Sequence, residues 1–220
     1  MPGTGLEPAR LAAYAPQAYV YTNFTIPACL YILSDSFKLY LMKLSSKEIA
    51  LGAGLASLSA VFQLIHLGYR FPQWGMWLDL VAVTWIVAYF LKGVRLAFIV
   101  SVIGAIVITL FAPDTWLGAS MKWLATAPLW LALAINPPSH YIKAWRLVPP
   151  FFLGIFIRLV IVIPLNYFYA IPIWTGMSPQ LAMQVIPWYV IGGFNFFQSL
   201  IDLSLAWILV FKFKLNRYAD

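Results

Sequence analysis

The chain has 220 residues, of which 63% are hydrophobic and only 10% are charged, and its net charge is +7. With a mean hydropathy of +0.85, this composition excludes an ordinary water-soluble domain and is typical of a protein surrounded by lipid. The basic residues occur as scattered pairs rather than as a stripe interleaved with exposed aromatics, so we expect a lipid bilayer and no nucleic acid as partner.

The first 45 residues differ from the rest of the chain. Residues 1–16 contain Pro, Gly and a single Arg, and we expect them to form a flexible tail. Residues 17–44 are aromatic and apolar but interrupted by polar side chains. This pattern favours an amphipathic segment that lies on the membrane surface, with a seventh spanning helix as the alternative. We therefore divide the chain into an N-terminal region (1–45) and a membrane domain (46–220).

The membrane domain contains six long apolar runs, most of them near the ~20 residues that a helix needs to cross a bilayer. The sequence therefore predicts an all-α fold, a six-helix transmembrane bundle with an extra N-terminal interfacial or membrane segment. The gaps between runs are too short for a soluble domain, so any function takes place between the helices. The runs cover residues 49–68, 76–91, 94–112, 116–135, 147–170 and 183–211.

The Lys and Arg residues fall at alternate gaps between these runs. Arg70 lies alone on one side, and by the positive-inside bias the other side is the cytoplasm, so both termini of the bundle are expected there. The cytoplasmic side would carry Lys43, Lys47, Lys92, Arg95, Lys143, Arg146, Lys212, Lys214 and Arg217.

Polar side chains inside the apolar runs are the candidate functional residues, because an ionisable group there is costly and normally faces a partner or a ligand. Five of them come to a similar depth, with Asn195 and Gln198 roughly 18 and 22 Å into the long last run. These five are Asp79, Lys122, Asn166, Asn195 and Gln198. We expect them to line a pocket for a small planar ligand, and the alternative is that they only hold helices together. The candidate ligand-binding residues are Asp79, Lys122, Trp123, Asn166, Tyr167, Asn195 and Gln198.

Two further groups have structural roles in this interpretation. Arg158 and Asp202 are expected to form an ion pair between the fifth and sixth helices, outside the ligand site. Gly52, Ala56 and Ala60 recur at four-residue spacing, so they leave one side of the first helix almost free of side-chain bulk. Such a small-residue stripe permits close approach of another helix, either of a partner protein or of the chain's own bundle.

Sequence patterns for catalysis and metal binding are absent. The chain has no HExxH or GxSxG motif and no pair of carboxylates spaced for acid–base work, so a membrane enzyme is the weakest of three interpretations. A single cysteine and two distant histidines predict neither a disulfide nor a metal site. We expect no cofactor.

Several short motifs, in order from residue 48 to 215, together resemble the substrate-binding S components of energy-coupling factor vitamin transporters, and among these the riboflavin type. This chain departs from the type at Gln198, where a lysine is expected, and at Lys122, where an asparagine is expected. The motifs are Ala56-Ser-Leu-Ser-Ala60, Trp77-Leu-Asp79-Leu, Leu91-Lys-Gly93-Val-Arg-Leu-Ala97, Gly118-Ala-Ser-Met-Lys122-Trp-Leu-Ala125-Thr, Pro164-Leu-Asn166-Tyr167 with Pro172, and Phe194-Asn195-Phe-Phe-Gln198.

The resemblance implies a membrane subunit that binds a vitamin, riboflavin or another flavin-like planar ligand, and delivers it to a coupling protein and two ATPases. It also implies that the stripe Gly52, Ala56 and Ala60 contacts the coupling protein. The absence of a GxxxxGK[ST] phosphate loop agrees with an external energy source. The alternative is an accessory subunit of a larger membrane complex that keeps the fold without the ligand site.

Overall fold

The chain is described here by a computed structural model, which places residues 44–65, 68–71, 76–111 and 115–218. These residues belong to one compact unit that begins at Leu44. The sequence predicts a tail and an interfacial segment in residues 1–45. Residues 1–43 of this region lie outside the described residues.

The first helix, α2 (Ser46–Leu64), begins with a capping box. The Ser45 hydroxyl accepts a hydrogen bond from the Glu48 N–H at 3.2 Å, and the Glu48 carboxylate accepts one from the Ser45 N–H at 2.8 Å. The bonds donated by Ser45, with a smaller contribution from Lys92 and Arg95 nearby, lower the pKa of the Glu48 carboxyl. The start of α2 therefore lies at the same end of the bundle as Lys92 and Arg95.

A short antiparallel hairpin follows α2 and departs from the predicted all-helical pattern. Its strands are β1 (Gly68–Phe71) and β2 (Met76–Asp79), and Gly68 lies opposite Asp79. A Cβ on Gly68 would lie 1.8 Å from the Leu78 carbonyl oxygen, so only glycine permits this approach of the strands. The prediction that a helix begins at residue 76 is wrong, because the chain remains extended to Asp79.

Of the next three helices, the second and third agree to within two residues with the predicted apolar runs 94–112 and 116–135, whereas the first begins five residues after the start of its run. Gly93, with a φ of 84°, forms the turn between the first two of them, a backbone conformation that glycine adopts without strain. These helices are α3 (Val81–Lys92), α4 (Val94–Phe111) and α5 (Thr115–Leu133), and the 3₁₀ helices η3 (Pro138–Ile142) and η4 (Ala144–Leu147) follow.

Proline shapes the last third of the chain. Residues 183–211 were predicted as one helix, but Ile186 is extended before Pro187, so the helix divides there. Before Pro172, Ile171 donates to the carbonyl of Asn166, five residues earlier, which widens one turn into a π-helix. The elements are α6 (Val148–Leu165), η5 (Asn166–Ala170), α7 (Ile171–Thr175), α8 (Pro179–Val185), α9 (Trp188–Trp207), η6 (Ile208–Lys212) and η7 (Leu215–Tyr218).

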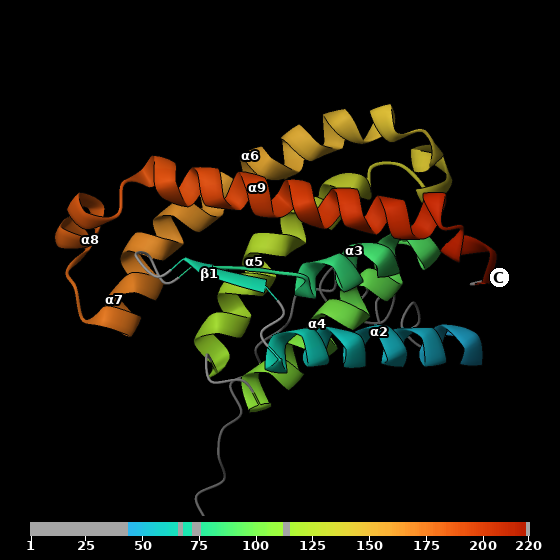
Figure 1. The fold of residues 1–220 in the computed structure, drawn as a ribbon, viewed down its shortest axis with the longest axis horizontal. Helices are drawn as coiled ribbons and strands as arrows, with labels where there is room; N and C mark the ends of the chain where they lie inside the picture. Colours follow the sequence, from blue (N-terminus) through green and yellow to red (C-terminus); the bar gives the residue numbers. More distant parts are fainter. Residues whose placement is uncertain (1–43, 66–67, 72–75, 112–114, 219–220) are drawn as a thin grey trace, which may run out of the picture. The chain divides into compact units, whose positions relative to one another are not determined.

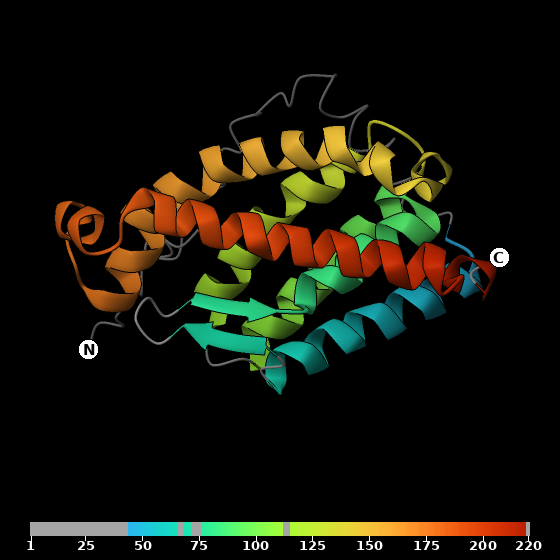
Figure 2. The same cartoon turned by 45° about the horizontal axis from the view of Figure 1, so that its top comes forward.

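Two continuous helical stretches, 144–175 and 188–212, are long and apolar enough to cross a membrane, whereas α3 and α4 are apolar but shorter. Figures 1 and 2 show α6 and α9 side by side along the bundle. On α6, the large side chains Phe152, Phe156 and Val160 are each more than half exposed, as expected for a surface in contact with lipid. The count of six spans remains a prediction.

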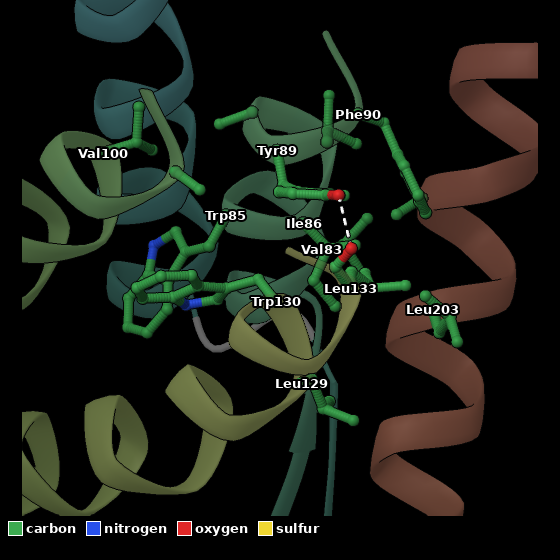
Figure 3. Close-up of a cluster of buried hydrophobic side chains, with 14 of the residues drawn as sticks. Val83, Trp85, Ile86, Tyr89, Phe90, Val100, Leu129, Trp130, Leu133 and Leu203 are labelled. Carbon is green, nitrogen blue, oxygen red and sulfur yellow. Dashed lines mark hydrogen bonds between the residues drawn. The ribbon is translucent and has the colours of Figure 1, made fainter. Parts of the chain in front are cut away.

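Helix α3 lies at the centre of the bundle, and every residue from Val81 to Phe90 is buried. A helix that is apolar on all sides needs such a central position. The Trp85 indole N–H donates to the Ser59 hydroxyl at 2.9 Å, which joins α3 to α2. The Tyr89 hydroxyl lies 2.6 Å from the Leu133 carbonyl at the end of α5, and Figure 3 shows this bond beside Trp85 and Trp130.

Close packing of α5 against α6 depends on Gly154. A Cβ at this position would lie 3.1 Å from both the Leu129 Cα and the Pro128 carbonyl oxygen, backbone atoms that cannot turn aside. We expect Gly154→Ala to lower the free energy of unfolding by about 1–3 kcal/mol, measured by unfolding in detergent micelles. The matched control is Gly193→Ala on α9, where no atom lies within 4 Å. Equal stability of the two variants would contradict this account of the α5–α6 contact.

Candidate ligand-binding site

Asp79 and Lys122 form an ion pair inside the bundle. Asp79 ends strand β2 and Lys122 lies on α5, and their side chains are 11% and 19% exposed. The Lys122 ammonium also donates to the Gln63 amide oxygen at 3.0 Å. The charge of Lys122 therefore holds the hairpin and the end of α2 against α5.

Gln198 connects the hairpin to α9. Its amide N–H group donates to the Asp79 backbone carbonyl and to the Asp202 carboxylate, both at 2.8 Å. Its amide oxygen accepts from the Asp79 backbone N–H at 3.3 Å. An amide both donates and accepts, whereas a lysine only donates. The glutamine at this position therefore matches both backbone groups of Asp79.

Arg158 on α6 is buried and bonds to two side chains of α9. Its guanidinium donates to the Asn195 amide oxygen and to the Ser199 hydroxyl, both at 2.8 Å. Arg158 and Asp202 interact electrostatically, but no direct salt bridge joins them among the described residues, and the guanidinium bonds to neutral groups instead. Asp202 instead accepts from Gln198, while its second carboxylate oxygen is buried without a hydrogen-bond partner among the described residues.

These contacts form two hydrogen-bonded groups, one around Asp79 and Lys122 and one around Arg158, which both include residues of α9 and are together called the polar network here. Asp202, predicted to lie apart from the site, bonds to Gln198 of the first group, whereas Arg158 belongs to the second. Gln63 and Ser199 were not predicted, although both are polar residues in apolar runs, which is the signal that identified the others. The network contains two basic and two acidic side chains. Its members are Gln63, Asp79, Lys122, Arg158, Asn195, Gln198, Ser199 and Asp202.

The division of the last predicted helix at Pro187 explains how Gln198 reaches the hairpin. Because α9 begins at Trp188, Asn195 and Gln198 lie about 10 and 15 Å along the helix instead of 18 and 22 Å. Both residues are buried. The shorter helix brings them to the level of the Asp79–Lys122 pair.

Three predicted site residues bond elsewhere. Asn166 donates to the Val162 carbonyl of its own helix at 2.8 Å. The Tyr167 hydroxyl donates to the Ile186 carbonyl at 2.7 Å, which ties the π-helical turn to the chain just before α9. The Trp123 indole donates to Ser101 on α4 at 3.1 Å. Direct bonds therefore join Asp79, Lys122 and Gln198, and Asn195 bonds separately to Arg158. Asn166, Tyr167 and Trp123 bond to neither group.

A groove of about 440 Å³ lies between α4 and α5. Its walls are mostly apolar, and it shares Trp123 with the predicted ligand residues but none of the network. Within the described ranges, no three His, Cys, Asp or Glu side chains lie close enough to hold a metal ion. The residues that line the groove are Val102, Ala105, Ile106, Thr109, Trp116, Ala119, Ser120, Trp123 and Leu124.

The small-residue stripe of α2 faces the chain's own bundle. Gly52, Ala56 and Ala60 are buried, and a Cβ on Gly52 would lie 3.0 Å from a methyl group of Leu96 on α4. The structure therefore corrects the interpretation of this stripe as a contact surface for a coupling protein. Small residues are exposed on the opposite side of α2, at Ala53, Gly54 and Ser57.

Comparison with solved structures identifies the fold. The chain superposes with a TM-score of 0.62 on a structure described as "Structure and mechanism of the S component of a bacterial ECF transporter". The match covers 78% of this chain and 97% of the other, at 22% sequence identity. No protein-family model and no curated protein matches the chain by sequence. The chain therefore has the fold of an S component.

Proposed function

We propose that the chain is the membrane-embedded substrate-binding subunit of a vitamin uptake transporter in a prokaryotic cell membrane. The observation that carries this proposal is the polar network in the interior of an S-component fold. Charged and amide groups at such a depth are costly unless they serve a ligand or each other. Asp79, Lys122 and Gln198 lie nearest to the hairpin end of the bundle, where a ligand from outside would enter.

The ligand proposed is riboflavin or another flavin-like planar molecule. The amide and carboxylate groups of Asp79, Gln63 and Gln198 provide alternating hydrogen-bond donors and acceptors. Such a pattern can match the donors and acceptors along the imide edge of a flavin ring. Because these atoms bond to one another in the described structure, a ligand binds by exchanging some of those bonds for its own.

Energy for transport comes from partners in this proposal. The sequence contains no phosphate-binding GxxxxGK[ST] loop, and the chain would deliver its ligand to a transmembrane coupling protein driven by ATPase subunits. The exposed small residues Ala53, Gly54 and Ser57 on α2 offer a surface that another helix can approach closely.

A specific observation favours a second candidate, an accessory subunit of a larger membrane complex. Apart from one carboxylate oxygen of Asp202, the polar groups of the network side chains bond within the protein, and the groove found between α4 and α5 lies away from them. Such a network stabilises a bundle without any ligand. The same fold then serves assembly rather than transport.

Flavin binding tests the first candidate. The purified protein is expected to quench riboflavin fluorescence on binding, and Gln198→Ala is expected to weaken binding about tenfold, because it removes bonds worth roughly 1.4 kcal/mol. The matched control is Gln184→Ala, which changes an exposed glutamine on α8. Folded protein without flavin binding, or equal losses in both variants, would refute a flavin site at Gln198.

The Asp79–Lys122 pair gives a test of stability. We expect Lys122→Gln and Asp79→Asn each to lower the free energy of unfolding by roughly 1–3 kcal/mol, since each leaves one largely buried charge without its partner. The double variant places two neutral amides there and is expected to recover part of the loss. Unfolding in detergent micelles measures all three, and strictly additive losses would show that the pair contributes no coupling.

Co-purification distinguishes the two candidates. The tagged protein, extracted in mild detergent, is expected to retain ATPase subunits and a coupling protein if it serves transport. Replacing the exposed Ser57 by Trp should release them while the melting temperature stays the same. Other membrane subunits without any ATPase would instead support the accessory role.

A further inference from the structure

The connection between α5 and α6 presents an apolar row on its outer side. Residues 138–148, here called the strap, contain η3 and η4 and lead into α6. Ile142, Trp145 and Val148 follow at three-residue spacing and are 60%, 67% and 51% exposed. Tyr141 is fully buried, and its carbonyl accepts a hydrogen bond from the Trp207 indole at 2.8 Å. The strap is thus fixed to the bundle on one side and apolar on the other.

Cations accompany this apolar row. Lys143 is exposed, and the Arg146 guanidinium lies 5.6 Å from the centre of the Trp145 ring, over its face. Arg146 also donates to the His140 carbonyl at 3.2 Å, which holds the guanidinium beside the strap. An arginine stacked in this way keeps further N–H donors for an anion.

Other basic residues gather at the same end of the bundle. The strap, the start of α2 and the C-terminal segment lie together at the right-hand end of Figures 1 and 2. Lys47, Lys212, Lys214 and Arg217 are exposed there. The described residues include three acidic side chains, and two of them belong to the polar network. The third, Glu48, accepts hydrogen bonds from Ser45, so the described residues at this end carry a strong excess of positive charge.

We propose that the strap is a binding site for an anionic phospholipid. The row Ile142, Trp145 and Val148 lies among the upper parts of the acyl chains, and Lys143 and Arg146 bind the headgroup phosphate. A tryptophan beside cations is the combination that the membrane interface favours, because its ring is amphipathic. An acidic soluble partner would match the charge but would leave three apolar side chains without contact. The site does not depend on the vitamin or on the coupling module.

The test uses the full-length protein in nanodiscs and in detergent micelles. Native mass spectrometry measures how much phosphatidylglycerol and phosphatidylcholine the protein retains from an equal mixture. We expect preferential retention of phosphatidylglycerol, about tenfold lower for Lys143→Gln/Arg146→Gln and restored by Lys143→Arg/Arg146→Lys. High salt should reduce the preference. Quenching by brominated phosphatidylglycerol, compared with Trp145→Phe, measures whether Trp145 lies at the lipid interface.

The matched control removes the same charge from the same end of the bundle. Lys47→Gln/Arg217→Gln leaves the strap intact and is expected to retain phosphatidylglycerol nearly as the unmodified protein does. If Arg146→Gln disturbs folding, Lys143→Gln alone changes one exposed side chain and still lowers retention. Equal retention of the two lipids, equal losses in strap and control variants, or an acidic protein bound at the strap in place of lipid would each overturn the proposal.

Discussion

A charged side chain that is surrounded by lipid and packed helices must find its partner within the protein, since no water is at hand to solvate it. Asp79, Lys122 and Arg158 meet this constraint through an ion pair and through amide and hydroxyl groups, and Asp202 does so with one of its two carboxylate oxygens. Most of these bonds cross from one element to another, whereas the bond from Gln198 to Asp202 lies within α9. The requirement to satisfy these four charges therefore helps to set where the hairpin, α2, α5, α6 and α9 lie relative to one another.

Much of this arrangement could be predicted from the sequence, because an interrupted apolar run is visible without a structure. Asp79, Lys122 and Gln198 were identified as polar residues at a shared depth, and the structure joins them directly. Their partners could not be predicted, since partner choice depends on helix rotation and length. Pro187 illustrates this point, because the helix division there changed the depth of Gln198 and gave it access to the Asp79 backbone.

Other features depend on tertiary contacts that sequence patterns do not contain. The hairpin has strands of four residues, too short for a clear alternation, and its close approach at Gly68 exists only when both strands are present. The spacing of Gly52, Ala56 and Ala60 correctly indicated close helix contact but not which helix would make it. Asn166 and Tyr167 resembled ligand residues by position, yet in the structure both side chains donate to backbone carbonyls, of Val162 and Ile186.

The bond between Lys122 and Asp79 has a thermodynamic consequence for the hairpin. Asp79 is both the last residue of β2 and the counterion of Lys122. When the hairpin moves away, the Lys122 ammonium therefore loses its anion. By linkage, any molecule that supplies another anion to Lys122 loosens the hairpin, and any force that lifts the hairpin raises the affinity of Lys122 for such a molecule by an equal free energy.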